Sequence, residues 1–316
     1  MPVSGVLAGQ GANGRPRLVV SLATIPSRIR ELAPVIDSLK EQERVPDGIN
    51  VCISPFCEWE GGAYDVPGWL LDDPAVRVCV APVDYGPANK LLGVLPLETD
   101  PTTQIVIVDD DWQCRPTLIA DLAERFRPNE RTAIGLSGAR LPRWWSRIDV
   151  RIGSEIERSP PMPWRLTFVA EPSRELSVDI LQFGFGSMVQ RGWFTDDIYS
   201  MVAPLRPWFY ADDVFLSGYL EQKGIGRQCL AGLRLPLPLA HAQLSPLSGE
   251  GRMRARYRAA IPALASTLGI WSASELLHPF TRMPTLGELG HWTAQALRRG
   301  RRAARKIAKR DWLQRD

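Results

Sequence analysis

The chain has 316 residues, of which 45% are hydrophobic and 23% charged, with a formal net charge of +3. This is the composition of a soluble globular protein with a sizeable core. No apolar run approaches the roughly 18 residues needed to cross a bilayer, and the N-terminus lacks the pattern of a secretory signal, so we expect a cytoplasmic protein.

The positive charge is concentrated at the C-terminal end of the chain. Residues 298–316 contain nine Lys or Arg and two acidic residues, so the rest of the chain is mildly acidic. On a helical wheel over 292–310, small and apolar residues fall mostly on one side and basic residues on the other. This pattern predicts a basic amphipathic helix suited to an anionic membrane surface. A solvated or disordered tail fits the same residues, and no nucleic-acid-binding module accompanies it, so we expect no nucleic-acid partner.

The five cysteines form no C-x-x-C pair and are odd in number. They predict reduced core cysteines rather than a zinc site or disulfides. Residues 1–16 are expected to be disordered. Their glycines spell G-x-G-x-x-G, but no strand precedes them, as a dinucleotide-binding fingerprint requires.

From residue 17 onward, apolar strands and amphipathic helices alternate. This predicts an α/β fold with a Rossmann-like mixed central sheet flanked by helices. We expect strands at 18–23, 49–54, 76–81, 104–108, 177–190 and 225–230. We expect helices at 27–43, from about 87, and at 116–125, 211–223 and 252–268. Residues 141–165, rich in tryptophan and proline, are expected to form a long loop or flap.

The stretch IVIVDDD at 105–111 carries the strongest functional signal. Four β-branched residues predict a strand buried on both faces, and Asp109, Asp110 and Asp111 follow at its carboxyl end, where open α/β sheets bind ligands. Three adjacent carboxylates repel one another, so we expect a positive counter-charge, and a hard divalent cation suits oxygen ligands. An acidic turn that caps the next helix is the alternative.

Two further segments bear on the chemistry. In DYGPANKL, Asp84 to Leu91, a Gly-Pro turn opens a helix with Lys90 on its first turn. A helix N-terminus with a lysine attracts phosphate, although a surface lysine fits the pattern equally well. In ADDVFLSGYL, 211–220, Asp212 and Asp213 open an apolar helix. Either aspartate could cap that helix, or act as a general base if burial raises its pKa.

Taken in order, SLATIPSRI (21–29), DYGPANKL (84–91), IVIVDDD (105–111), LQFGFGSMV (181–189) and ADDVFLSGYL (211–220) resemble a glycosyltransferase of the GT-A fold. The resemblance is to bacterial family-two-like enzymes that use nucleotide-diphospho-sugars. It covers roughly 17–275, which we take as the glycosyltransferase domain, with 276–316 as a basic helical tail.

The resemblance implies roles for particular residues. The nucleotide would lie on Ala23, Thr24 and Arg28, with Asp84 and Lys90 near its phosphates. Asp109 and Asp110 would contact the nucleoside, Asp111 and Asp109 would hold Mn²⁺ or Mg²⁺, and Asp213, beside Asp212, would be the base of an inverting reaction. Further expected residues are His241 for the metal and, for the acceptor, Gly184, Gly186, Ser187, Trp144 and Trp145.

His241 also fits a plain loop histidine, and the two tryptophans also fit a flap packed on the sheet. The acceptor would be a glycan or a lipid-linked sugar of bacterial surface-polysaccharide synthesis. One alternative is a sugar-phosphate nucleotidyltransferase. That class has a Gly-rich, Arg-containing loop after its first strand, where this chain has ATIPSR. The other alternative is a degenerate carbohydrate- or membrane-binding module.

Overall fold

A computed structural model describes residues 15–141, 167–201, 210–244 and 252–271. The predicted basic tail, the N-terminal segment before residue 15 and most of the predicted flap therefore lie outside the described residues. The helices and strands described here belong to one compact unit of the chain. Among the described residues, no helix is long and apolar enough to cross a membrane.

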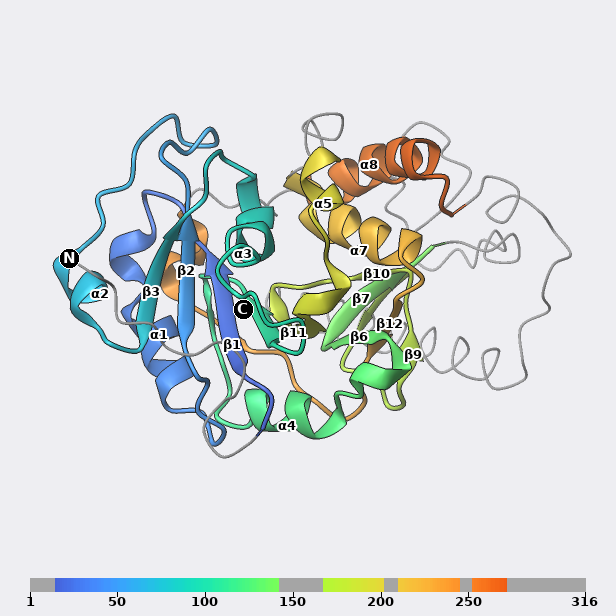
Figure 1. Ribbon diagram of the computed structural model, residues 1–316, viewed down its shortest axis with the longest axis horizontal. Helices are drawn as coiled ribbons and strands as arrows, with labels where there is room; N and C mark the ends of the chain where they lie inside the picture. The colour runs from blue at the N-terminus through green and yellow to red at the C-terminus, as the bar shows by residue number, and fades with distance from the viewer. Residues whose placement is uncertain (1–14, 142–166, 202–209, 245–251, 272–316) are drawn as a thin grey trace, which may run out of the picture. The chain divides into compact units, whose positions relative to one another are not determined.

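The core of the fold is an eight-stranded mixed sheet in the order β3-β2-β1-β4-β11-β6-β12-β9 (Figure 1). Its strands are β1 (Leu18–Ala23), β2 (Ile49–Ile53), β3 (Val76–Val80), β4 (Gln104–Val108), β6 (Thr132–Gly135), β9 (Leu176–Ser177), β11 (Phe185–Gln190) and β12 (Gly226–Cys229). The four strands from β3 to β4 are mutually parallel, whereas β11 runs antiparallel to both β4 and β6. The predicted α/β fold with a mixed central sheet is confirmed.

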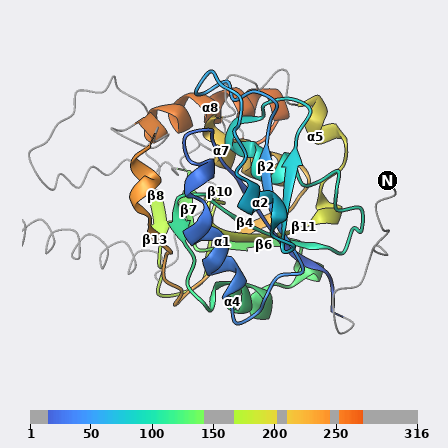
Figure 2. The same ribbon diagram turned by 90° about the vertical axis from the view of Figure 1, so that its left-hand side faces the viewer.

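Two small sheets and a set of helices complete the described fold. The small sheets contain β7 (Ser137–Arg140), β8 (Thr167–Ala170) and β10 (Ile180–Leu181), and β5 (Trp112–Gln113) with β13 (Leu237–Pro238). The helices are α1 (Ala33–Lys40), α2 (Gly68–Asp72), α3 (Asn89–Leu92), α4 (Leu118–Arg125), α5 (Asp197–Ser200), α7 (Asp212–Gln222) and α8 (Arg252–Leu268). Figure 2 shows α1 and α4 on one side of the sheet and α7 and α8 together on the other.

The strand order places a topological switch point at the carboxyl ends of β1 and β4. From β1 the chain continues to β2 and β3 on one side, and β4 then adds on the other side of β1. Ligands of open α/β sheets bind in the crevice that such a reversal leaves open. Every residue of β4 is buried, as its apolar run predicts, so the acidic residues that follow it are held at this crevice by the core.

Some predicted elements have different bounds. The helix predicted at 27–43 is a short 3-10 turn followed by α1, because Pro34 favours a new first turn and the Ser27 side chain and backbone bond Glu60 instead. The strand predicted at 177–190 divides into β9, β10 and β11. A turn at Phe183–Gly184 precedes β11, and Gly186, with φ of +104°, allows a bulge that no other residue type adopts readily.

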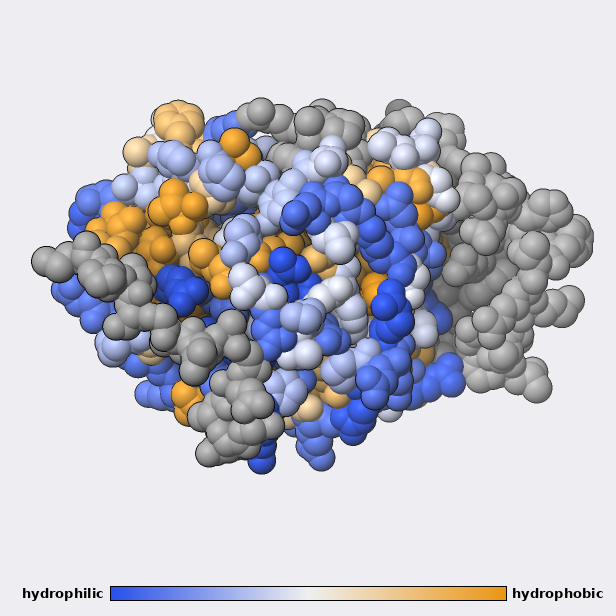
Figure 3. All heavy atoms as spheres, in the orientation of Figure 1, coloured by the Kyte–Doolittle hydropathy of each residue, from blue (hydrophilic) through white to orange (hydrophobic). Residues whose placement is uncertain are grey.

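Exposed apolar side chains gather along 56–83, which includes the edge strand β3. The large ones are Phe56, Trp69, Leu71, Val80 and Val83. Figure 3 shows apolar residues on the left-hand part of the face, where Figure 1 places β3 and α2. The five cysteines are all buried and free, as predicted from their spacing.

Candidate active site

A pocket of about 420 Å³ opens at the switch point between β1 and β4. Its walls come from the ends of β1, β4 and β11 and from the starts of α3 and α7, with α8 on one side. The lining includes all the aspartates singled out in the sequence: Asp84, Asp109, Asp110, Asp111, Asp212 and Asp213. Pockets of this size hold ligands as large as a cofactor or a sugar nucleotide fragment.

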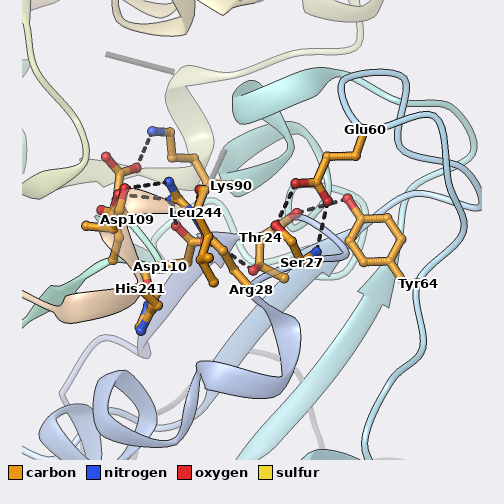
Figure 4. Close-up of polar contacts among 12 residues, drawn as sticks. Thr24, Ser27, Arg28, Glu60, Tyr64, Lys90, Asp109, Asp110, His241 and Leu244 are labelled. Carbon is orange, nitrogen blue, oxygen red and sulfur yellow. Dashed lines mark hydrogen bonds and ion pairs between the residues drawn. The ribbon is translucent and has the colours of Figure 1, made fainter. Parts of the chain in front are cut away.

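Arg28 provides the first counter-charge to the three adjacent aspartates. Its guanidinium Nη1 donates to Asp110 Oδ1 and to Asp111 Oδ2, each at 2.9 Å. Asp110 Oδ2 also accepts the hydroxyl of Thr24 at 2.7 Å. Figure 4 shows Arg28 reaching from the end of β1 toward this acidic turn. Asp110 thus connects the segment that follows β1 with the turn that follows β4.

The segment 240–244 fixes the position of the Arg28 guanidinium through two backbone carbonyls. Its Nε donates to the carbonyl of Leu244 at 2.8 Å, and Nη2 donates to that of Ala242 at 3.2 Å. His241 lies beside them with Nε2 2.8 Å from the backbone carbonyl of Asp110. Because a carbonyl only accepts, Nε2 carries the proton and donates. This bond ties 240–244 to the acidic turn, and the role of His241 as a metal ligand stays a prediction.

Lys90 provides the second counter-charge and joins the two acidic segments. Its ammonium lies 2.6 Å from Asp109 Oδ1 and 2.8 Å from Asp212 Oδ2 (Figure 4 shows the contact with Asp109). The side chain is only 4% exposed. Burial alone would lower the pKa of Lys90, but the carboxylates of Asp109 and Asp212 outweigh it and hold that pKa well above its usual value. Lys90 is therefore not a surface lysine, and it lines the pocket between the two acidic segments.

Asp213 lies on the side of the pocket formed by α7 and α8. Its Oδ1 accepts the backbone N–H of Phe183 at 2.9 Å, and its Oδ2 accepts the hydroxyl of Tyr257. Burial, and next to it the charge of Asp212, raises the pKa of Asp213 to about 7. A carboxyl group with such a pKa is suited to exchange protons near neutral pH. The side chain is half-buried and lines the pocket, so a ligand can reach it.

Three other aspartates of the pocket also have a raised pKa. Burial, reinforced by the charges of Asp109 and Asp110, raises the pKa of Asp111 to about 7. Burial also raises the pKa of Asp110 and of Asp212, against the opposing effects of Arg28 and Lys90. The pocket thus contains more carboxylate than its own cations neutralise, which favours a cationic partner.

In the turn before β11, the missing side chain of Gly184 leaves space that Asp109 uses. A Cβ on Gly184 would lie 1.7 Å from Asp109 Oδ2, so the carboxylate of Asp109 occupies the space that a side chain would fill. The turn residues predicted for the acceptor lie in different surroundings. Gly186 faces Leu118, and Ser187 is fully buried and donates to the carbonyl of Phe183. Of the predicted turn residues, only Gly184 lines the pocket.

Gly184→Ala is therefore expected to displace Asp109 and to weaken its ion pair with Lys90. We expect a lower melting temperature and loss of ligand binding that depends on Asp109. Gly68→Ala is a useful control, because Gly68, like Gly184, has no positive φ, and a Cβ there meets only Asp72 Oδ2, at 4.0 Å. Equal melting temperatures and equal binding for Gly184→Ala and the parent protein, measured by thermal unfolding and calorimetry, would contradict the close approach.

The remaining predicted residues divide into two groups. Ala23, Thr24, Arg28, Asp84 and Lys90 all line the pocket, as expected. Asp84 uses both carboxylate oxygens to accept the N–H groups of residues 58, 86 and 89, so it shapes the loop around the pocket. Trp144 and Trp145 lie outside the described residues.

Several pocket residues carry no clear signal in the sequence: Trp59, Tyr64, Gln182, Tyr210, Arg256 and Tyr257. Trp59 and Tyr210 are 5.2 Å apart between ring centroids, and the guanidinium of Arg256 lies over both rings. These residues come from a loop, from the start of α7 and from α8. Of these residues, Gln182 lies within the segment LQFGFGSMV (181–189), and Tyr210 stands two positions before Asp212.

The residues present fit a divalent cation that shares its coordination with a ligand. In the part of the chain that the structure describes, no three His, Cys, Asp or Glu side chains form a metal-holding group by themselves. Asp111 Oδ1, however, is buried in the site without a hydrogen-bond partner. Mg²⁺ commonly uses one or two carboxylates, water and substrate phosphates. Asp111 with Asp109 suits that kind of site.

Comparison with known proteins gives only distant similarity. No protein-family model matches the chain, and no curated protein matches it in sequence. A solved structure of 4-diphosphocytidyl-2C-methyl-D-erythritol synthase is similar over 77% of this chain and 98% of its own, with 14% identity and a TM-score of 0.40. The 2-C-methyl-D-erythritol 4-phosphate cytidylyltransferase of Francisella tularensis is similar over 69% and 89%, with 14% identity and a TM-score of 0.35. Similarity at this level supports no statement about activity.

Proposed function

We propose that this protein is a metal-assisted glycosyltransferase that moves a sugar from a nucleotide-diphospho-sugar to a hydroxyl acceptor. The observation that carries the proposal is one pocket with two kinds of carboxylate. Asp109–Asp111 lie at the switch point of the sheet, and Asp213, with a pKa raised to about 7, lies at the start of α7 in the same pocket. Glycosyl transfer needs charge stabilisation at the leaving group and a base at the acceptor.

The charges of the pocket support a metal-bound diphosphate. Six carboxylates face it, and the cations Arg28 and Lys90 are already paired with four of them. A bare diphosphate would be repelled by this arrangement. Asp111 and Asp109 would hold Mn²⁺ or Mg²⁺ together with the donor phosphates, and the bound ion would stabilise the leaving nucleoside diphosphate as a Lewis acid.

The protein's own groups account for the other steps. The acceptor oxygen forms a bond to the anomeric carbon while the bond from that carbon to the diphosphate oxygen breaks. Asp213 takes the hydroxyl proton, and the nucleoside diphosphate leaves with the electron pair of the broken bond. Lys90 holds Asp109 and Asp212 at fixed positions between the two walls. A glycan or a lipid-linked sugar is our proposal for the acceptor, with inversion at the anomeric carbon.

Nucleotidyl transfer from a nucleoside triphosphate to a sugar phosphate is the second candidate. The observation in its favour is that two buried cations, Arg28 and Lys90, face the pocket where phosphates would lie. Such a reaction has an acceptor phosphate that is already ionised, so it has no need of a base with a pKa near 7. The Asp213 site therefore favours glycosyl transfer.

A product assay separates the two reactions. The purified protein is first screened by thermal shift against nucleotide-sugars and nucleoside triphosphates, with and without Mn²⁺, since a ligand that binds the folded state raises the melting temperature. Ligands that bind are then incubated with candidate acceptors. Release of nucleoside diphosphate supports glycosyl transfer, and release of pyrophosphate from a triphosphate supports nucleotidyl transfer. Donor binding that is unaffected by chelator would contradict the metal site in both.

Asp111→Asn tests the metal role directly. The change keeps the shape of the side chain and removes one carboxylate from the site, while Asp110 still pairs with Arg28. We expect the fold to persist and the Mn²⁺-dependent part of donor binding and turnover to fall by about a hundredfold or more, the scale of a lost electrostatic contact in a site. Asp72→Asn, an exposed residue of α2, is the matched control. Full activity of Asp111→Asn in the presence of chelator would contradict the proposal.

A further inference from the structure

The carboxylate of Asp213 is held by a residue from a distant part of the chain. Tyr257, on α8, donates its hydroxyl proton to Asp213 Oδ2, 44 positions earlier in the sequence. The opposite oxygen, Oδ1, accepts the backbone N–H of Phe183. Two donors on different oxygens fix both the position and the plane of the carboxylate. Each oxygen keeps a second lone pair, so the group can still accept a proton from a ligand.

Tyr257 is itself fixed by its surroundings. The residue is 2% exposed, and its ring lies 6.1 Å from that of Phe168 on β8. The side chain of Gln182, another residue of the pocket wall, hydrogen-bonds its hydroxyl. A buried tyrosine hydroxyl without a hydrogen-bond partner would destabilise the fold. The bond between Tyr257 and Asp213 gives a partner to both groups.

We propose that Tyr257 is a positioning residue of the active site, which orients Asp213 toward the acceptor hydroxyl and favours the ionised form of its carboxylate. The inference rests on the proposed function of Asp213 as the base. It gives α8 a role beyond packing on α7, because α8 supplies the donor that prepares the base. Tyr257 touches Asp213 and acts through it, so the bond-making steps remain with the aspartate.

The direction of the effect follows from the groups around Asp213. Asp212 on α7 raises its pKa, while Lys90 on α3, the Tyr257 hydroxyl on α8 and the Phe183 N–H before β11 lower it. A hydrogen bond donated to a carboxylate stabilises its charged form. Removal of the Tyr257 hydroxyl therefore leaves Asp213 with a higher pKa, and the base is protonated over a wider range of pH.

The test is the pH profile of Tyr257→Phe, which keeps the ring and removes the hydroxyl. We expect the acid limb of kcat/KM to move to higher pH by about one unit, the effect of losing one bond to a charged group. At pH 7 turnover should then fall by about fivefold, because the ionised fraction of the base drops from about one half to about one tenth, and it should largely recover near pH 9. Tyr219→Phe is the matched control, because Tyr219 donates at 2.8 Å to Asp197, a residue that does not line the pocket. Its acid limb should not move.

A second variant keeps the hydroxyl and guards against a folding defect. Tyr257→3-fluorotyrosine carries a more acidic phenol and donates a stronger hydrogen bond, so the acid limb should move to lower pH. Opposite shifts in the two variants would support a tuned hydrogen bond. A uniform loss of turnover at every pH, with no movement of the limb in either variant, would overturn the proposal and leave Tyr257 as a packing residue.

A measurement without turnover separates this inference from the proposed function. The carboxyl ¹³C resonance of Asp213, assigned by its absence from Asp213→Asn, is titrated in the parent protein and in Tyr257→Phe. We expect a pKa that is higher by about one unit in the variant. If no donor and acceptor give turnover but the pKa shifts, the proposed reaction fails and the coupling stands. If turnover is found and the pKa does not shift, the coupling fails and the reaction stands.

Discussion

Asp213→Asn should lower turnover by about a hundredfold or more while donor and metal affinity survive, because a general base contributes on that scale. Asparagine keeps the size of the side chain, and its carbonyl oxygen still accepts the N–H of Phe183. It cannot take a proton from the acceptor. The donor would be held by the other acidic segment, so its Kd should be close to that of the parent protein. Steady-state kinetics and calorimetry measure the two effects separately.

The pH dependence of the parent protein follows from the same group. Burial and Asp212 raise the pKa of Asp213 to about 7, so turnover should decrease as pH falls below neutrality and the base becomes protonated. The free energy of unfolding changes with pH in the opposite direction to turnover. An aspartate in the unfolded chain has a pKa of about 3.9. Between about pH 4 and 7 the folded state therefore binds a proton at Asp213 that the unfolded state has lost, so stability decreases as pH rises through this range. Asp213→Asn removes that decrease, and its melting temperature at pH 8 should not be lower than that of the parent protein.

Asp212→Asn decides between the two adjacent aspartates. Asp212 is buried and paired with Lys90, so we expect its replacement to disturb the lysine and both walls of the pocket, with losses in stability as well as turnover. A fully active Asp213→Asn beside an inactive Asp212→Asn would reverse the two roles. Full activity of both would mean that the pair only shapes the start of α7.

The sheet and its switch point were predictable because local pattern determines them. The apolar runs at 18–23 and 104–108 form β1 and β4 with the predicted bounds, and the aspartates after β4 lie at the predicted edge. Buried parallel strands need continuous apolar sequence, so the signal is strong. The helix at 252–268 was also predicted with its observed bounds.

The contacts that organise the site were not predictable, because they join residues far apart in the sequence. Lys90 meets Asp212 across 122 positions, and Tyr257 meets Asp213 from α8. The sequence predicted a positive counter-charge for the three aspartates, but periodicity does not indicate which side chain supplies it. Arg28 and Lys90 supply part of it, through their ion pairs with Asp110, Asp111 and Asp109.

Two smaller differences have similar causes. The glycine before β11 was expected to leave space for a sugar, yet the space at Gly184 contains the carboxylate of Asp109. A missing side chain in the sequence does not show which neighbour uses the gap. His241 was expected on a metal, but its ring donates to the carbonyl of Asp110. A histidine's partner depends on the path of the loop that carries it, and loop paths have no periodic signal.

Lys90→Met should have the largest effect on stability, with a loss of about 3–5 kcal/mol at pH 8, the scale for removing one partner of a buried ion pair. Methionine fills a similar volume without the charge, so Asp109 and Asp212 lose their shared counter-ion in a buried setting. Protonation of Asp212, whose pKa burial already raises, would relieve the repulsion. Lys90→Met should therefore lose less stability at pH 5.5 than at pH 8, and urea unfolding at the two pH values measures the difference.

Two companion variants make this result specific to the buried pair. Lys40→Met removes a lysine that pairs with Asp73 on the surface, and its urea midpoint should hardly change, since exposed pairs contribute little. Lys90→Met combined with Asp212→Asn removes one of the two carboxylates left unpaired and should recover part of the lost stability. A loss of stability in Lys90→Met that is the same at both pH values and unaffected by Asp212→Asn would indicate altered packing of the methionine. In that case the lysine would not be the charge that joins the two acidic walls of the pocket.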